Sequence, residues 1–480
     1  MTIAPTPVVP PSTRFLRSGA PAAPLPEALA VLAARTAVAR EASLTGFLAA
    51  TDHNLGHFEI QAAHDGQELL RTATQRAAQA RADATPPRCP VCGRPLSQCS
   101  RGHARTCLTR FGDITMARPR GYCKRCRKWR PPADPALGLE APAGYSPAVQ
   151  ALVALAASKW PVAEASGVRE QLAGGRLPPA TLDREAKRQG QRAQRLRTQL
   201  DQPAAAEAKQ LERVLQPYPP IIQLDAWNLR ERDAWGQSAS LRRRGQEPDR
   251  WHWVWTGTVF RLDHRGETAG GRPVIVQRGD VFTRQGLDAL REQLHAEALR
   301  RGLGQAASVL VIGDGAVWIG RWADDRWPLA QQRLDFYPAV QHLVAVGRAL
   351  WGEDKVQFKA WLKPLVRQLK NESAVKVIRP LEEALANLPV GPVAEAVAQE
   401  VASLREHQDR MDYRAARRAG EPLGRGPVEA TCRQAQCRFK RPGQFWSQTG
   451  DEALLCLETF WRNDRWALLF PHPAFDPAKN

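Results

Sequence analysis

Residues 280–319 read DVFTRQGLDALREQLHAEALRRGLGQAASVLVIGDGAVWI. An apolar, β-branched start gives way to a segment whose apolar residues recur three and four apart, and then to a run of Val, Leu and Ile that ends at Asp314. This succession predicts strand, helix and strand. Similar Val- and Ile-rich runs precede it at 219–225, 252–262 and 272–282, so we expect an α/β or α+β domain from about residue 216.

Charge indicates the kind of partner. The chain has 480 residues, with 68 Lys and Arg against 49 Asp and Glu, and a formal net charge of +19. Nucleic acid is the first partner that such a balance suggests, although a GC-rich genome that favours Arg codons is an alternative. The most apolar windows, such as 151–157, are much shorter than the roughly 20 residues that span a bilayer. With no signal-peptide pattern at residues 1–15, we expect a cytoplasmic, nucleoid-associated protein.

Helical patterns flank the predicted strands. Residues 26–84 suggest two helices, and residues 146–200 suggest three helices around a Gly-Gly turn, the last of them basic. The second group resembles a helix-turn-helix arrangement. A long helical stretch follows from about 340 to 420, and the last helices lie after it.

Two Cys-x-x-Cys pairs suggest a metal site. Cys89 and Cys92 form the first pair, Cys123 and Cys126 the second, and residues 105–123 between them have the pattern of a β-hairpin. The sequence therefore predicts a zinc ribbon with structural Zn²⁺, since four thiolates leave no open position for water. Ordinary buried cysteines and a redox pair are the alternatives. A third alternative is that one of the intervening residues Cys99, His103 and Cys107 replaces a ligand of the two pairs.

Acidic residues end several apolar runs. Asp225 ends PPIIQLD, Asp314 ends ASVLVIGD, and Asp335 ends the shorter QQRLD. Glu429 lies in the first turn of a helix that Pro427 starts. Carboxylates that converge in this way can hold two divalent cations about 4 Å apart. Alternatively, Asp314 belongs to an Asp-Gly turn, and Glu429 interacts with the helix dipole.

The segments around these acids resemble a known family. The resemblance is to bacterial insertion-sequence transposases of the Kra group and covers about residues 86–466. Its blocks are 280–319 with 331–343, the closing block 411–457, CPVCGRPL at 89–96 with the hairpin, and 136–158.

The resemblance implies an RNase H-like fold with a DDE triad of Asp225, Asp314 and Glu429. The triad would hold Mg²⁺ or Mn²⁺, with Asp335 as a further candidate ligand or a helix cap. The expected protein is multidomain α+β. Its segments are a disordered leader (1–25), a helical N-terminal region (26–85), a zinc-ribbon module (86–135), a helical, helix-turn-helix-like DNA-binding region (136–215), the catalytic domain's first part (216–340), an all-helical insertion (341–420), and the domain's second part with a C-terminal helix (421–480).

Two positions depart from the family pattern. The family usually has His where Pro338 stands and Ser where Arg425 stands, and the residues after Asp225 lack its Gly-Thr pattern. These departures bear on activity rather than on fold.

Cations and aromatic residues near the acids suggest contacts with DNA. The expected DNA-binding residues are Arg242, Arg243, Arg244, Arg433, Arg438, Lys440 and Arg441. The tryptophans considered as stacking platforms for unpaired bases are Trp227, Trp251, Trp253, Trp255, Trp318, Trp322 and Trp327. We expect most of them in the core.

The resemblance implies a transposase that binds element ends and catalyses metal-dependent DNA cleavage and strand transfer. It also implies the partners, which would be the double-stranded DNA of the ends and the target, with a homo-oligomer on DNA because two ends are handled together. No membrane or small-molecule substrate is expected. The alternatives are a catalytically inactive or domesticated zinc-ribbon DNA-binding protein, and a nuclease or resolvase that hydrolyses without joining.

Overall fold

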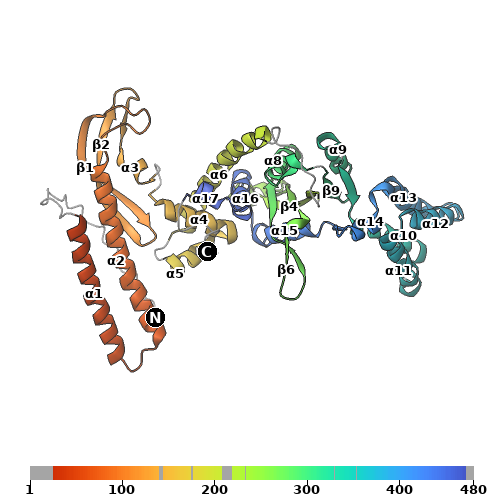
Figure 1. Cartoon of the computed structure of the whole chain (residues 1–480), viewed down its shortest axis with the longest axis horizontal. Coiled ribbons are helices and arrows are strands. Elements are labelled where there is room, and N and C mark those ends of the chain that lie inside the picture. The colour runs from red at the N-terminus through yellow and green to blue at the C-terminus, as the bar shows by residue number, and fades with distance from the viewer. Residues whose placement is uncertain are drawn as a thin grey trace. The chain divides into compact units, whose positions relative to one another are not determined.

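The computed structural model describes residues 25–139, 144–173, 177–207, 219–232, 234–306, 308–328, 330–352 and 354–471. The protein is mixed α+β and divides into two compact units, residues 1–149 with 170–176 and residues 150–169 with 177–480 (Figure 1). The leader predicted over 1–25 lies outside the described residues except for Leu25. No helix in the described ranges is long and apolar enough to cross a bilayer.

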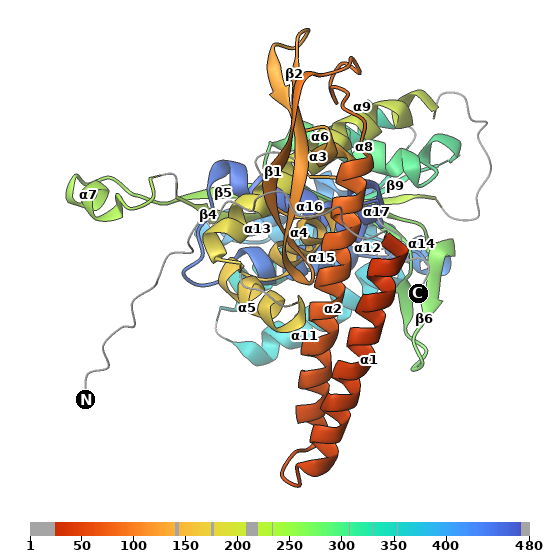
Figure 2. The same cartoon turned by 90° about the vertical axis from the view of Figure 1, so that its left-hand side faces the viewer.

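The first unit joins a helical hairpin to a small sheet. Figure 2 shows its two long helices side by side, with the two long strands beside α2. The elements are α1 (Leu25–Ala49), α2 (Leu55–Ala84), β1 (Ser97–Thr109), β2 (Gly112–Cys123), β3 (Lys128–Arg130) and α3 (Ala133–Ala136). β1, β2 and β3 form an antiparallel sheet in that order, and the hairpin expected between the cysteine pairs is β1 and β2.

Glutamine side chains attach α2 to the sheet. β3 pairs only with residues 121–123 of β2, so the backbone of β2 at Ala117 is free of strand partners on that side. The Gln79 side chain donates to the Ala117 carbonyl at 2.9 Å and accepts from its N–H at 2.8 Å. The amide thus covers an edge that would otherwise be available for pairing with another strand.

The second unit is built on a five-stranded sheet. Its strands are β4 (Ile221–Glu231), β5 (Arg250–Phe260), β8 (Arg278–Thr283), β9 (Leu310–Gly313) and β10 (Gln331–Leu334). The order is β10-β9-β4-β5-β8, with β4, β5 and β8 antiparallel and β9 and β10 parallel to β4.

Helices lie against both faces of this sheet. α8 (Leu287–Arg300) and α9 (Val317–Arg326) pack Leu290, Leu294 and Trp322 against Ile222 and Leu224 of β4. α15 (Gly426–Phe439) lies on the opposite face, where the Val428 N–H donates to the buried Gln223 side chain at 3.2 Å. The sheet is therefore the middle layer of an α/β/α arrangement.

Two expectations about local structure are wrong. β4 does not end at Asp225 but continues to Glu231, because β5 pairs with it over its whole length and buries Trp227 and Leu229. The run at 272–282 is two strands, β7 (Pro273–Ile275) and β8, since the N–H groups of Val276 and Gln277 turn to the His264 carbonyl.

Further helices complete the unit. α4 (Pro147–Lys159), α5 (Val162–Ala173) and α6 (Pro179–Glu207) are the three helices expected around the Gly-Gly turn, and α16 (Gln448–Arg462) packs along α6. Gly190 of α6 allows close contact, because a Cβ there would lie 2.3 Å from the Ala453 carbonyl oxygen. The short elements are α7 (Ser238–Arg243), β6 (Arg265–Glu267), α17 (Trp466–Leu469) and the 3₁₀ turns Leu262–His264, Leu303–Gln305 and Gln408–Arg410.

The helical stretch between β10 and α15 has its own core. Its helices are α10 (Phe336–Trp351), α11 (Lys355–Asn371), α12 (Val375–Ala386), α13 (Pro392–Glu406) and α14 (Tyr413–Arg418). Leu343, Val377 and Val401 are among the residues buried at its centre. Pro338, one of the two departures from the family pattern, lies in the first turn of α10, where proline costs no hydrogen bond of the helix.

Candidate functional site

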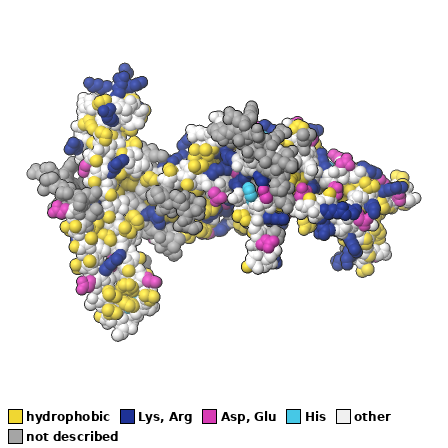
Figure 3. Space-filling model, viewed as in Figure 1, with side chains coloured by type: hydrophobic (Ala, Val, Ile, Leu, Met, Phe, Trp, Pro, Cys, Tyr) yellow, Lys and Arg dark blue, Asp and Glu magenta, His cyan; other side chains and the backbone are white. Residues whose placement is uncertain are grey.

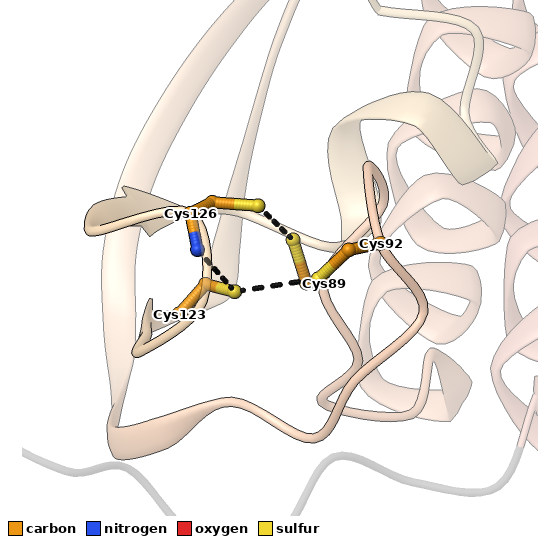
Figure 4. Close-up of side chains that lie close together, drawn as sticks. All are labelled: Cys89, Cys92, Cys123 and Cys126. Atoms are coloured by element: carbon orange, nitrogen blue, oxygen red, sulfur yellow. Dashed lines mark hydrogen bonds between the residues drawn. The ribbon is translucent and has the colours of Figure 1, made fainter.

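The four predicted zinc ligands lie together. Cys89 and Cys92 come from the loop before β1, Cys123 ends β2, and Cys126 lies in the turn between β2 and β3 (Figure 4). The sulfurs of Cys89 and Cys126 are 3.9 Å apart, and those of Cys92 and Cys123 are 3.5 Å apart. Gly93, at φ 72°, makes the left-handed turn that closes the first pair.

The chemistry of this cluster fits Zn²⁺. Burial opposes ionisation of Cys89, but N–H groups of Val91 and Cys92 stabilise its thiolate and lower its pKa to about 6. The pKa of Cys126 is raised, because its thiol is hydrogen-bonded to Cys92 and burial disfavours a second charge beside the first. Crowded sulfurs that cannot all ionise alone are suited to a divalent cation. Among the described residues this is the one group of three or more Cys, His, Asp or Glu whose ligand atoms all lie within 4.8 Å of one another.

The intervening alternatives are not part of the cluster. Cys107 is buried with Ile114 and Met116 in the hydrophobic core of the hairpin, and its pKa is raised to about 11 by burial. Cys99 is exposed and donates to the Leu96 carbonyl, while His103 bonds to Ser100. The ligand set is therefore the two Cys-x-x-Cys pairs.

Three of the predicted acidic residues meet on one arginine. Arg425, directly before α15, has its Nη1 atom 3.5 Å from Asp225 and 3.4 Å from Asp314. Its Nε atom lies 3.3 Å from Asp335, and Nη1 also donates to the Leu224 carbonyl at 2.9 Å. Arg425 is 7% exposed, so its charge is held inside the protein by these groups.

Asp335 anchors this arrangement. It is fully buried, caps α10 by accepting from the Tyr337 N–H at 2.9 Å, and accepts from the Arg425 N–H at 3.0 Å. A Cβ at Gly424 would lie 2.7 Å from its Oδ1 atom, so only glycine lets the loop pass this close. The expected alternative role of Asp335, a helix cap, is thus the one seen.

Glu429 lies in the first turn of α15, where its N–H donates to the Arg425 carbonyl at 3.1 Å. The predicted triad of Asp225, Asp314 and Glu429 is not assembled as a set of metal ligands among the described residues. Cys432, one turn later, lies beside Asp225; burial raises the pKa of the Cys432 thiol, and the charge of Asp225 adds to the shift. Helix α15 therefore contacts β4 at Asp225 through Cys432.

The predicted cations fall into two groups. Arg242, Arg243 and Arg244 at α7, together with Arg433, are exposed. The prediction for Arg438 is wrong: it is buried and donates to the Ala157 carbonyl at 2.7 Å, and burial lowers its pKa to about 10.

Lys440 and Arg441 are exposed but bonded within the unit. The Lys440 Nζ atom donates to Asn228 at 2.8 Å, and the Arg441 Nη1 atom to Glu164 at 2.7 Å. Both side chains remain open to solvent, so they add positive charge next to α15.

Two tryptophans are exposed on the sheet. Trp251 and Trp253 of β5 are 56% and 52% exposed, whereas Trp227 and Trp322 are buried. Trp255, Trp318 and Trp327 are half-buried among the α8 and α9 contacts. Most of the tryptophans thus pack in or against the core, as expected.

Cations lie beside Trp251. Arg230, opposite Trp251 on β4, has its guanidinium 5.5 Å from the centre of a Trp251 ring and 5.0 Å from that of Phe445. The Lys440 Nζ atom lies 5.4 Å from the Trp251 ring. We call Trp251, Trp253, Arg230, Lys440 and Phe445 the Trp–Arg face.

A second basic surface was not predicted from the sequence. Figure 3 shows Lys and Arg side chains gathered over the part of the chain that Figure 1 draws as α10–α14. Arg414, Arg417 and Arg418 of α14 line an open hollow of about 440 Å³ with Asn371. The helical segment therefore carries positive charge of its own.

A buried charge network was also not predicted from the sequence. Arg284 contacts Glu231, and its Nε atom lies 3.2 Å from Asp451. Burial raises the pKa of Asp451 to about 9, with Arg284 opposing the shift and the hydrogen bond to Glu231 adding to it. The network joins β4, β8 and α16, elements far apart in the sequence.

Comparison with protein families and curated proteins identifies no relative of this chain. A scan against protein-family models finds no match, and a search of the curated proteins finds none either.

Proposed function

We propose that the chain is a DNA transposase of the insertion-sequence type, with an RNase H-like domain as its catalytic unit. It binds the DNA of its element's ends through the zinc ribbon and the helices α4–α6, and it works in the cytoplasm, at the nucleoid. Two copies or more act together on a pair of ends, and target DNA is the second substrate.

One observation carries the proposal. The sheet order β10-β9-β4-β5-β8, with an antiparallel trio followed by two parallel strands, is the order of RNase H-like domains. In it, Asp225 lies on the central strand, Asp314 follows the neighbouring parallel strand, and Glu429 lies in the first turn of α15, the helix that packs on the central strand after the helical segment. Carboxylates on adjacent parallel strands are expected to meet, and Arg425 shows that Asp225 and Asp314 do.

The carboxylates as arranged do not fit the divalent metal that this reaction class needs. Nη1 of Arg425 lies between Asp225 and Asp314, so a guanidinium stands where a shared cation would bind. Among the described residues, the carboxylate oxygens of Asp225, Asp314 and Glu429 do not all lie within 4.8 Å of one another. The arrangement with Arg425 in place therefore does not provide a metal site for phosphoryl transfer.

Arg425 also favours a second candidate function. A chain whose carboxylates are already neutralised could bind element ends without cutting them, as a silent, domesticated DNA-binding protein. The two candidates share the zinc ribbon, the fold and the basic surfaces, and they differ in phosphoryl transfer alone.

A cleavage and joining assay separates the candidates. The probe is a plasmid that carries the chain's reading frame with its flanking DNA, incubated with zinc-loaded protein and Mg²⁺ or Mn²⁺. The transposase proposal predicts cut ends and joined products that Asp314→Asn and Glu429→Gln abolish while DNA binding persists. Binding without cutting supports the silent candidate, and cutting without joining supports a nuclease.

The Trp–Arg face supports the nucleic-acid part of the proposal. Exposed indole rings with cations beside them can stack an unpaired base and hold its phosphate at once. The face lies on the same two strands as Asp225, farther along toward Glu231 and Arg250. Because successive residues of a strand alternate between the two faces of the sheet, Arg230 and Trp251 lie on the side opposite to Asp225, and the face would be a separate surface for unpaired bases.

Trp251→Ala is expected to weaken binding of a fluorescein-labelled 12-nucleotide oligothymidylate. Base–aromatic stacking contributes about 1–3 kcal/mol per base, so we expect a loss of about 5- to 160-fold in affinity by fluorescence anisotropy. Trp251→Phe, which keeps a ring, serves as the control and should lose much less. Equal affinity of wild type and Trp251→Ala would contradict a role of the face in binding unpaired bases.

A further inference from the structure

Arg425 contacts three carboxylates, whereas a single salt bridge takes one. Its guanidinium contacts the carboxylates of Asp225, Asp314 and Asp335, which come from β4 and from the ends of β9 and β10. One positive charge thus faces three carboxyl groups. Two of them keep solvent contact, since the Asp225 and Asp314 side chains are 24% and 39% exposed, whereas Asp335 has none.

Each carboxylate is also positioned by backbone groups. Asp225 Oδ1 accepts from the Ala226 N–H at 2.9 Å, and Asp314 Oδ1 accepts from the Ala316 N–H at 3.1 Å. Asp335 accepts from two N–H groups, as described above. The three aspartates are therefore held in place without the guanidinium, and Arg425 supplies mainly charge between them.

We propose that Arg425 is a tethered cation that takes the place of a divalent metal in this chain. While its side chain lies between Asp225 and Asp314, the guanidinium offsets the negative charge of these carboxylates and repels a second cation brought to the same place. The site is then closed to Mg²⁺ and Mn²⁺ until the side chain is removed or leaves. This inference deepens the proposed function, since it concerns the same carboxylates, but metal binding can be measured without DNA.

Arg425→Ser removes the positive charge and replaces the long side chain with a small polar one. Electron paramagnetic resonance of free Mn²⁺, with the zinc-loaded full chain, measures the affinity. The variant is expected to bind Mn²⁺ with a dissociation constant at least about tenfold below that of the wild type, which is the effect expected from removing a charge-assisted competitor.

Two further variants make the result specific. Arg425→Lys keeps a cation at the same place and is expected to resemble the wild type. Arg425→Ser/Asp314→Asn removes a carboxylate and is expected to lose the added Mn²⁺ affinity. If Arg425→Ser folds poorly, Arg425→Gln replaces it. A thermal unfolding temperature that Mn²⁺ raises in Arg425→Gln but not in the wild type would also support the tethered cation.

The inference is overturned if the wild type binds Mn²⁺ as tightly as Arg425→Ser and Arg425→Gln. Its failure is distinguishable from that of the proposed function. Mn²⁺ gained by Arg425→Ser without any DNA cleavage supports the tethered cation and contradicts the transposase. DNA cleavage by a wild type that already binds Mn²⁺ as tightly as the variants supports the transposase and contradicts the tethered cation.

Discussion

Replacing Cys123 with Ser is expected to release about one zinc ion per chain and to unfold the segment from Cys89 to Arg130. Cys123 is fully buried, and the cluster joins the loop before β1 to the turn between β2 and β3. The hydrophobic core around it is small, formed by Cys89, Leu96 and Cys123 with the two remaining cysteines. Metal binding by such modules is worth about 10–16 kcal/mol, far more than this core supplies, so folding and metal are coupled.

Elemental analysis and limited proteolysis measure this effect. Cys99→Ser is the control, because Cys99 is exposed and lies outside the cluster. The control should keep its zinc and its resistance to protease, whereas Cys123→Ser should lose both. Equal zinc content in Cys123→Ser and wild type would show that the cluster is not a zinc site.

Arg284→Met is expected to lower the free energy of unfolding of the second unit by about 3–5 kcal/mol, the cost of leaving a buried charge without its partner. Glu231 and Asp451 are both fully buried and both depend on Arg284. Arg250 also reaches Glu231, at 3.3 Å, but its side chain is largely exposed and interacts more weakly. Urea unfolding followed by tryptophan fluorescence measures the difference.

A surface arginine provides the matched control. Arg379 pairs with Glu383 one helical turn away, and both side chains are largely exposed. Such pairs contribute at most about 1 kcal/mol, so Arg379→Met should change stability little. If the two Met variants were equally stable, the buried network would not be a stabilising unit.

The same network predicts a pH dependence. The pKa of Asp451 is raised in the folded state, to about 9 from an ordinary 3.8, so between these values the folded chain keeps a proton that the unfolded chain releases. The unfolded state then binds fewer protons, and this group makes the free energy of unfolding fall as pH rises through that window. Asparagine cannot ionise, so the free energy of unfolding of Asp451→Asn should fall less than that of the wild type between pH 5 and pH 9 in the same urea measurement. An equal slope in both proteins would contradict the raised pKa.

Local patterns predicted much of what is found. The two Cys-x-x-Cys pairs were predicted as ligands, and the structure brings their sulfurs together. Asp314 and Asp335 follow β9 and β10 as their apolar runs indicated. These features depend on residues close in sequence, where spacing alone carries the information.

Features that depend on distant contacts were not predictable in the same way. Arg425 could be identified as an unusual residue, but its position between three aspartates depends on how α15 returns to β4 after the helical segment. The sequence predicts Arg438 as a surface cation, because no residue close to it in the sequence indicates that Ala157 lies beside it in the fold. The sequence predicts a strand end at Asp225, because this polar residue interrupts the apolar run. In the structure, pairing with β5 continues the strand to Glu231.

The most direct test of the account compares strand transfer by three forms of the full, zinc-loaded chain: wild type, Arg425→Ser, and Arg425→Ser/Asp314→Asn. Each is incubated with Mg²⁺ and the plasmid that carries the reading frame and its flanking DNA, and joined products are counted by sequencing. We predict that Arg425→Ser cuts and joins at least about tenfold faster than the wild type, as removal of a charge-assisted competitor would allow, and that the double variant does neither. Products formed equally by wild type and Arg425→Ser, or retained by the double variant, would contradict a carboxylate site that Arg425 holds closed.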